Sequence, residues 1–138
     1  MSIKVNAINH VSLVVKDKAA AERFYIGVLG LQRHPKIASW LILNERDTLH
    51  LLSIPEAIVE NSLYHKLQHF GLEVPDIREV ATLLLKGGLK PFQMDFKGDT
   101  NEINGEADPL NFGTGTVFVY DPDGNLFEFI QLGCGIHS

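Results

Sequence analysis

The amino-acid sequence predicts an α+β fold made of two tandem βαβββ modules. The chain shows a strand–helix–strand–strand–strand pattern twice, and landmark residues in the two copies keep the same spacing. A histidine precedes a helix-capping aspartate by seven residues in both copies, at His10 and Asp17 and again at His69 and Asp76. A pattern that occurs twice indicates a duplicated module rather than a solenoid, which needs more copies.

Composition limits the classes of protein that are open to this chain. Its 138 residues predict a single domain spanning 1–138, and 45% apolar with 21% charged residues is typical of a globular protein. The single cysteine excludes an intramolecular disulfide and a cysteine-based zinc site. A net charge of -5 disfavours a nucleic-acid partner.

Apolar stretches are short throughout the sequence. None approaches the ~20 residues that span a bilayer, and the first residues lack the apolar core of a signal peptide. We therefore expect no membrane partner and a cytoplasmic location.

The first module is predicted to run from about residue 3 to 54. Apolar and polar residues alternate over 6–15, which is typical of a strand with two distinct faces. Asp17 is a helix cap and Gly30 a helix stop, so a helix is expected between them. Three further strands are expected at 31–36, 39–43 and 48–54.

The second module is predicted at about 67–132, after a linker at 55–66. Asp76 begins its helix, and a Gly87–Gly88 pair ends it. Strands are expected before and after that helix, at 67–74, 89–95, 114–120 and 126–131.

An insertion at 96–113 distinguishes the second module from the first. The segment is polar and rich in Gly, Asn and Asp. Long loops in compact domains are often functional, so two interpretations stay open: a lid over a binding site, or a mobile surface loop.

The repeat aligns four residues with metal-ligand chemistry. His10 precedes His50 by 40 residues and His69 precedes Glu128 by 59, and the difference of 19 is close to the length of the insertion. His50 and Glu128 therefore take corresponding positions in the last strands, as His10 and His69 do in the first strands. The other three histidines, His34, His65 and His137, have no such correspondence.

Strand periodicity supports this assignment for the last strands. His50 is flanked by Leu49 and Leu51, and Glu128 by Phe127 and Phe129, so each candidate lies opposite an apolar face. A carboxylate in an apolar strand needs a partner, because an unpaired buried charge is strongly disfavoured.

A divalent metal ion would supply that partner. Three imidazoles and one carboxylate suit Zn, Ni, Co, Mn or Fe(II). If His50 faces the substrate instead, two histidines and one carboxylate remain, which is the ligand set of non-haem iron oxygenases.

Several motifs make the sequence resemble the vicinal oxygen chelate superfamily. This superfamily includes glyoxalase I, extradiol dioxygenases, fosfomycin-resistance thiol transferases and bleomycin-resistance proteins. The resemblance covers roughly residues 3–132 and rests on Asn9–His10, on 22–25 with 28–31 in the first helix, on 68–74, and on 120–124 followed by Glu128.

The resemblance implies a cupped mixed sheet around one metal ion. It implies metal ligands at His10, His50, His69 and Glu128, with Glu128 as the proton-transfer base, and a homodimer that binds a small-molecule substrate. A glyoxalase-I-like subgroup carries the same His-Leu-Leu motif as this chain at 50–52.

Two departures bear on the substrate that the resemblance implies. Val14 stands where glyoxalase I places an arginine for the glutathione carboxylate, and Ile54 stands near the position of an asparagine. We therefore expect a metal-dependent enzyme of lyase or isomerase type whose substrate is not the usual glutathione hemithioacetal. Two alternatives stay open: an Fe(II) extradiol-type dioxygenase, and a non-catalytic protein that binds a small molecule as bleomycin-resistance proteins do.

Overall fold

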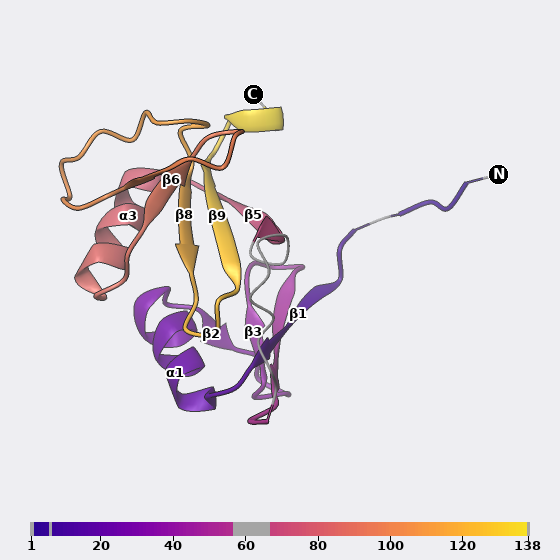
Figure 1. The fold of residues 1–138 in the computed structure, drawn as a ribbon. Coiled ribbons are helices and arrows are strands. Elements are labelled where there is room, and N and C mark those ends of the chain that lie inside the picture. Colours follow the sequence, from indigo (N-terminus) through magenta and orange to yellow (C-terminus); the bar gives the residue numbers. More distant parts are fainter. Residues whose placement is uncertain (1, 6, 57–66, 138) are drawn as a thin grey trace. The chain divides into compact units, whose positions relative to one another are not determined.

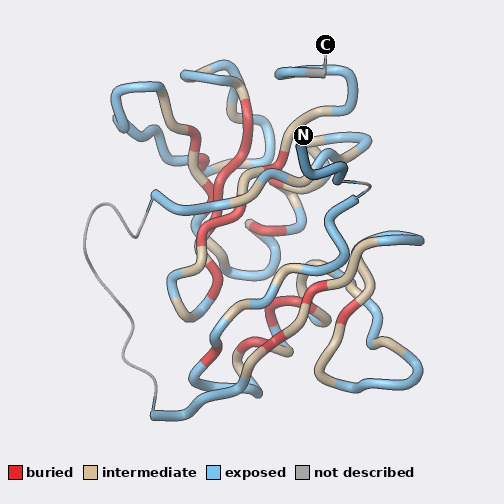
Figure 2. Tube along the Cα trace, turned by 90° about the vertical axis from the view of Figure 1, so that its right-hand side faces the viewer, coloured by how far each residue is buried: buried red, intermediate tan, exposed pale blue. Residues whose placement is uncertain are grey.

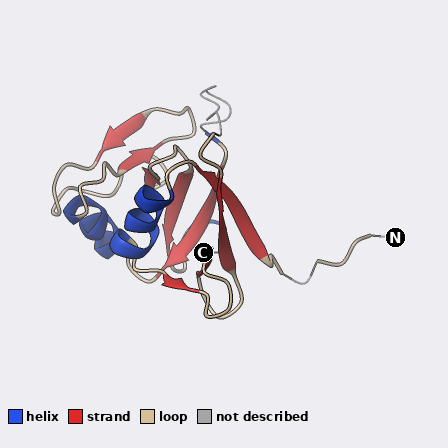
Figure 3. Ribbon diagram, turned by 90° about the horizontal axis from the view of Figure 1, so that it is seen from below, coloured by secondary structure: helices blue, strands red, loops and turns tan. Residues whose placement is uncertain are grey.

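The chain forms two compact units, Met1–Ile58 and Val59–Ser138, in a computed structural model. The structure describes residues 2–5, 7–56 and 67–137. Each unit contains one mixed sheet and an accompanying helical segment (Figure 1 and Figure 3). The predicted α+β fold of βαβββ modules is confirmed.

The first unit contains a four-stranded sheet in the order β1-β4-β3-β2. β1 pairs with β4 in parallel, whereas the β4–β3 and β3–β2 pairs are antiparallel. Its elements are β1 (His10–Val15), α1 (Lys18–Glu22), η1 (Arg23–Val28), β2 (Gln32–Arg33), β3 (Trp40–Ile42) and β4 (Thr48–Ser53).

The second unit contains a five-stranded sheet in the order β5-β9-β8-β6-β7. β5 and β9 pair in parallel, and the remaining pairs are antiparallel, so the first four strands repeat the pattern of the first unit. Its elements are β5 (His69–Val74), α3 (Ile77–Lys86), β6 (Phe92–Met94), β7 (Thr100–Glu102), β8 (Val117–Tyr120), β9 (Leu126–Gln131) and η2 (Gly135–His137).

The cores follow the predicted strand alternation. Leu49 and Leu51 are buried in β4 while His50 between them is half-buried, and Phe127 and Phe129 flank Glu128 in β9 in the same way. Buried positions gather along the strands and helices of each unit (Figure 2). The candidate residues therefore lie on the sheet faces opposite the apolar cores.

Aspartates begin both helices, as the sequence predicts. Asp17 accepts a hydrogen bond from the backbone N–H of Ala20, and Asp76 accepts from the N–H groups of Arg78 and Glu79. The first helix differs from the prediction because its second half, η1, is π-helical. Wider turns of this kind are rare within helices, and no periodicity in the sequence marks them.

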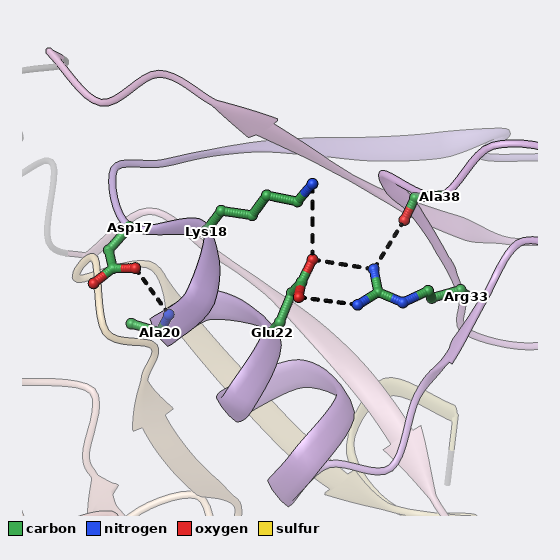
Figure 4. Close-up of polar contacts among 6 residues, drawn as sticks. All are labelled: Asp17, Lys18, Ala20, Glu22, Arg33 and Ala38. Atoms are coloured by element: carbon green, nitrogen blue, oxygen red, sulfur yellow. Dashed lines mark hydrogen bonds and ion pairs between the residues drawn. The ribbon is translucent and has the colours of Figure 1, made fainter.

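An ion pair links the first helix to β2 (Figure 4). Arg33 donates to both carboxylate oxygens of Glu22, at 2.9 and 3.1 Å, and to the carbonyl of Ala38. The hydrogen bond from Arg33 lowers the pKa of Glu22. β2 itself is shorter than predicted, because the strand ends before Pro35, which has no N–H to donate.

The insertion at 96–113 is partly regular structure. Its residues 100–102 form the edge strand β7, which pairs with β6. Arg78 of α3 donates to the carbonyl oxygens of Glu106 and Asp108 at 2.8 and 2.6 Å, and Ile103 is buried. These contacts anchor the middle of the segment at the edge strand and at α3.

The predicted linker at 55–66 falls largely on residues 57–66, which lie outside the described part of the chain. The module boundaries therefore stay predictions. Among the helices of the described residues, none is both long and apolar enough to cross a membrane.

Candidate functional site

Strand register places the candidate residues of the two units at equal offsets. His50 pairs with Ser12 across β1 and β4, and Glu128 pairs with Gly71 across β5 and β9. His10 lies two residues before Ser12, and His69 lies two residues before Gly71. The correspondence read from sequence spacing is therefore also a correspondence in the hydrogen-bonded sheets.

In the second unit the two candidate residues are in contact. His69 Nε2 lies 3.3 Å from Glu128 Oε1, and the side chains are 31% and 16% exposed. Both side chains are thus partly open to solvent, and that of Glu128 is the more shielded.

The hydrogen bond at the other ring nitrogen of His69 shows which nitrogen carries the proton in the neutral ring. Nδ1 lies 2.8 Å from the carbonyl oxygen of Leu67, and a carbonyl oxygen only accepts, so Nδ1 carries a proton. In the neutral ring, Nε2 then carries the lone pair that faces the carboxylate. Two electron-rich atoms this close require either a proton between them or a cation bound by both.

The second oxygen of Glu128 is held by hydroxyl groups. Thr116 donates to Glu128 Oε2 at 2.7 Å, and the Thr114 hydroxyl lies 2.7 Å from that of Thr116. No motif or spacing in the sequence marks these threonines as partners of Glu128. Thr116 lies within the strand predicted at 114–120, but periodicity does not show which residue of the neighbouring strand its side chain meets.

In the first unit an aromatic ring joins the two histidines. The Trp40 ring lies 4.7 Å from the ring of His10 and 4.7 Å from that of His50, and the His50 contact is stacked at 23°. Nδ1 of His10 lies 2.8 Å from the Asn9 side-chain oxygen, so this nitrogen donates and Nε2 remains available.

A cavity of about 410 Å³ opens beside Glu128 in the second unit. Gly71 lies in the wall of this cavity. A β-carbon at this position would lie 2.8 Å from Cδ1 of Ile130 and 3.6 Å from Glu128 Oε1, so a side chain here would crowd both residues. The absence of a side chain at Gly71 therefore leaves the carboxylate accessible. The lining residues are Gly71, Glu73, Glu128, Ile130, Cys134 and Ile136.

Aromatic residues share the sheet face of Glu128. Phe118 is the cross-strand partner of Glu128, and its ring makes an edge contact with His69. The Phe92 ring stacks against both Phe118 and Tyr120. Burial raises the pKa of Tyr120, so its hydroxyl is protonated at neutral pH.

The donor chemistry fits a divalent metal ion. In the second unit, Nδ1 of His69 is tied to an oxygen acceptor, which leaves Nε2 as a ligand atom, and Glu128 offers Oε1. In the first unit, His10 has Nδ1 tied in the same way. Across the residues that the structure describes, no cluster of three or more His, Cys, Asp or Glu side chains is found that could hold a metal.

His34 is the histidine outside the candidate set whose side chain the structure describes, and its ring makes a local contact. Nδ1 of His34 accepts from the backbone N–H of Lys36 in a local turn. His65 and the side chain of His137 lie outside the described part of the chain.

The chain belongs to the Glyoxalase/Bleomycin resistance protein/Dioxygenase superfamily, whose family profile matches residues 7–129. No curated protein matches the sequence. Members of this superfamily often bind divalent metals.

Solved structures share the fold at low sequence identity. A glyoxalase family protein from Enterococcus faecalis is 22% identical with a TM-score of 0.61, covering 90% of this chain and 96% of its own. A virulence protein from Salmonella typhimurium is 19% identical with a TM-score of 0.60, covering 94% and 98%. TnmS3, an antibiotic binding protein from a Streptomyces species, is 18% identical with a TM-score of 0.60, covering 94% and 98%.

Proposed function

We propose that the protein is a metal-dependent enzyme of lyase or isomerase type that acts on a small substrate with two vicinal oxygens. The observation that carries the proposal is the His69–Glu128 contact, with Nδ1 of His69 and Oε2 of Glu128 both held by other groups. This arrangement leaves one ring nitrogen and one carboxylate oxygen 3.3 Å apart, close enough for one ion to bind both.

We propose His10, His50, His69 and Glu128 as the ligand set of that metal. When bound, a divalent ion supplies Lewis-acid polarisation of substrate oxygens. Glu128 would accept the proton that lies α to a polarised carbonyl, and a base for this step must reach the proton directly or through one water. The cavity beside Glu128 provides space for a small molecule at that carboxylate.

The substrate is proposed not to be the usual glutathione hemithioacetal. Val14, which takes the position of the expected arginine, is a 41% exposed apolar side chain on the His10 face of β1. It offers no charge to a glutathione carboxylate.

Metal content measured on the full chain tests this proposal. We expect about one divalent ion per chain by elemental analysis, and a loss of metal in His10→Ala and His69→Ala. Glu128→Gln should abolish turnover while much of the metal stays bound, because the amide keeps a neutral oxygen ligand and loses the base. A chain that takes up no added metal would refute the enzyme proposal, and turnover by Glu128→Gln would eliminate this residue as the base.

The His50–Trp40 stack favours a second candidate, an Fe(II) extradiol-type dioxygenase. A stacked His50 that faces substrate leaves two histidines and one carboxylate as ligands. Oxygen consumption with catechols after anaerobic iron loading separates this candidate from the first.

The aromatic face of the second sheet favours a third candidate, a non-catalytic binding protein. The Phe118 ring contacts His69, Phe92 and Tyr120 extend this aromatic surface, and one protein of this fold is an antibiotic binding protein. Tight binding of an aromatic ligand by a metal-free chain would support this candidate. We also propose a homodimer, which sedimentation analysis tests.

A further inference from the structure

Thr116 occupies a buried position beside Glu128, next to an exposed hydroxyl. It lies one residue before β8, and since alternate strand residues share a face, it lies on the same face as Phe118, the cross-strand partner of Glu128. Thr116 is 7% exposed, whereas Thr114 is exposed. The two residues thus form a short path of hydroxyl groups between solvent and the carboxylate.

Counting protons sets the direction of these hydrogen bonds. An ionised carboxylate only accepts, so the single hydroxyl proton of Thr116 goes to Glu128 Oε2. Thr116 then has no proton for its neighbour, and Thr114 must donate to the Thr116 oxygen. The direction is therefore Thr114 to Thr116 to Glu128.

Gln93 holds the backbone of Thr116 independently of Glu128. This fully buried side chain donates to the Thr116 carbonyl at 3.1 Å and accepts from the Phe112 N–H at 3.1 Å. The segment that leads into β8 is thereby fixed to β6, and the backbone of Thr116 is held by a contact that does not involve Glu128.

We propose that Thr116 is the positioning residue for Glu128, with Thr114 as its hydrogen-bond donor. By holding Oε2, Thr116 fixes the carboxylate plane so that Oε1 points to His69 Nε2. The inference rests on the proposed role of Glu128 as ligand and base. It predicts that the orientation of the carboxylate depends on one hydroxyl group.

The variants Thr116→Val and Thr116→Ser test this assignment on the full chain. Valine keeps the shape of threonine without the hydroxyl, serine keeps the hydroxyl, and both keep the backbone carbonyl bonded to Gln93. Thr100→Val, on the exposed edge strand β7, is the matched control.

The first measurement is zinc affinity by calorimetry. We expect Thr116→Val to weaken binding by about 10–100-fold, because groups that orient a metal ligand typically contribute this much. Thr116→Ser should stay close to the wild type, and Thr100→Val should equal it. Equal affinities for Thr116→Val and the wild type would overturn the proposal, as would a serine variant as weak as the valine variant.

The second measurement needs no metal. The carboxylate stretch of Glu128, assigned by its loss in Glu128→Gln, should shift in the infrared spectrum of metal-free Thr116→Val and return in Thr116→Ser. If the wild-type chain binds no zinc but the two variants show this pattern of band shifts, the metal proposal is refuted and the role of Thr116 is supported. An unshifted band in a folded Thr116→Val chain would refute the role of Thr116.

Discussion

The two units present the same strand register with different chemistry at matching positions. Trp40 is the cross-strand partner of His50, and Phe118 is the cross-strand partner of Glu128. In the first unit the aromatic ring contacts both candidate residues, whereas in the second unit His69 and Glu128 contact each other directly.

The hydroxyl groups sharpen this contrast. Counting two residues back from each aromatic partner gives Ala38 in the first unit and Thr116 in the second. Ala38 has no side-chain donor, while Thr116 holds Glu128. The same backbone arrangement thus carries aromatic stacking in the first unit and the His69–Glu128 pair in the second. We propose that the second unit supplies the group that accepts a proton from the substrate.

The turns between the last two strands of each unit should differ most in their contribution to stability. Asp121 is 4% exposed and accepts from the N–H groups of Asp123 and Asn125 and from the Asn125 side chain. Asp121→Ala leaves these donors unpaired, so we expect a loss of about 2–4 kcal/mol in the free energy of unfolding, measured in denaturant.

Asn44 provides the matched control in the first unit. It accepts from the N–H groups of Arg46 and Asp47 in the same kind of turn, but it is exposed. Because water can replace these bonds, Asn44→Ala should cost about 1 kcal/mol or less. Equal losses in the two variants would contradict the assigned difference in burial.

A larger side chain should affect stability differently at the two positions that pair with His50 and Glu128 across the sheets. Gly71→Val places atoms against Ile130 and Glu128, so we expect a narrower cavity and a loss of about 1 kcal/mol from overpacking, because the Ile130 methyl that it meets is the end of a side chain and can move. Ser12 takes the corresponding position in the first unit and is exposed, so Ser12→Val should change stability by less than about 0.5 kcal/mol. Thermal unfolding of both variants measures the difference, and a fully stable Gly71→Val would contradict the close packing at this position.

The arginines that anchor the helical regions should differ in their pH dependence. Arg33 lowers the pKa of Glu22, so their bond stabilises the folded state above the ordinary carboxyl pKa of 4.5 and is lost as the pH falls through the lowered value. Arg33→Gln should therefore lower the melting temperature slightly at pH 7, and the difference should shrink as the pH falls below 4.5, because the Glu22 bond is lost while the bond to the Ala38 carbonyl does not titrate. Surface pairs contribute little, so this is the smallest effect expected.

Arg78 gives the comparison in the second unit. It donates to backbone carbonyls of Glu106 and Asp108, which do not titrate. The effect of Arg78→Gln should therefore be the same at pH 7 and pH 3. A pH-dependent effect of Arg78→Gln, or a pH-independent one of Arg33→Gln, would contradict these assignments.

Periodicity and repetition in the sequence were sufficient to predict the fold, but they did not predict the side-chain contacts of the site. Alternation predicted which side of β4 carries His50, and the repeat predicted the aspartate caps at Asp17 and Asp76, because both are local properties of the chain. The Thr116–Glu128 hydrogen bond and the Trp40 stack join neighbouring strands, so they depend on register, which the sequence pattern does not specify. The edge strand β7 was not predicted because its residues, Thr100–Glu102, are polar and exposed and show no alternation.

The central claim is that the His69–Glu128 pair of the second unit binds the metal ion. Zinc uptake by the full chain, compared between His69→Ala and His50→Ala, tests it most directly. We predict one zinc per wild-type chain, loss of binding in His69→Ala, and a smaller loss in His50→Ala, because His50 is stacked on Trp40 rather than paired with a carboxylate. Zinc bound equally well by His69→Ala and the wild type would contradict the account.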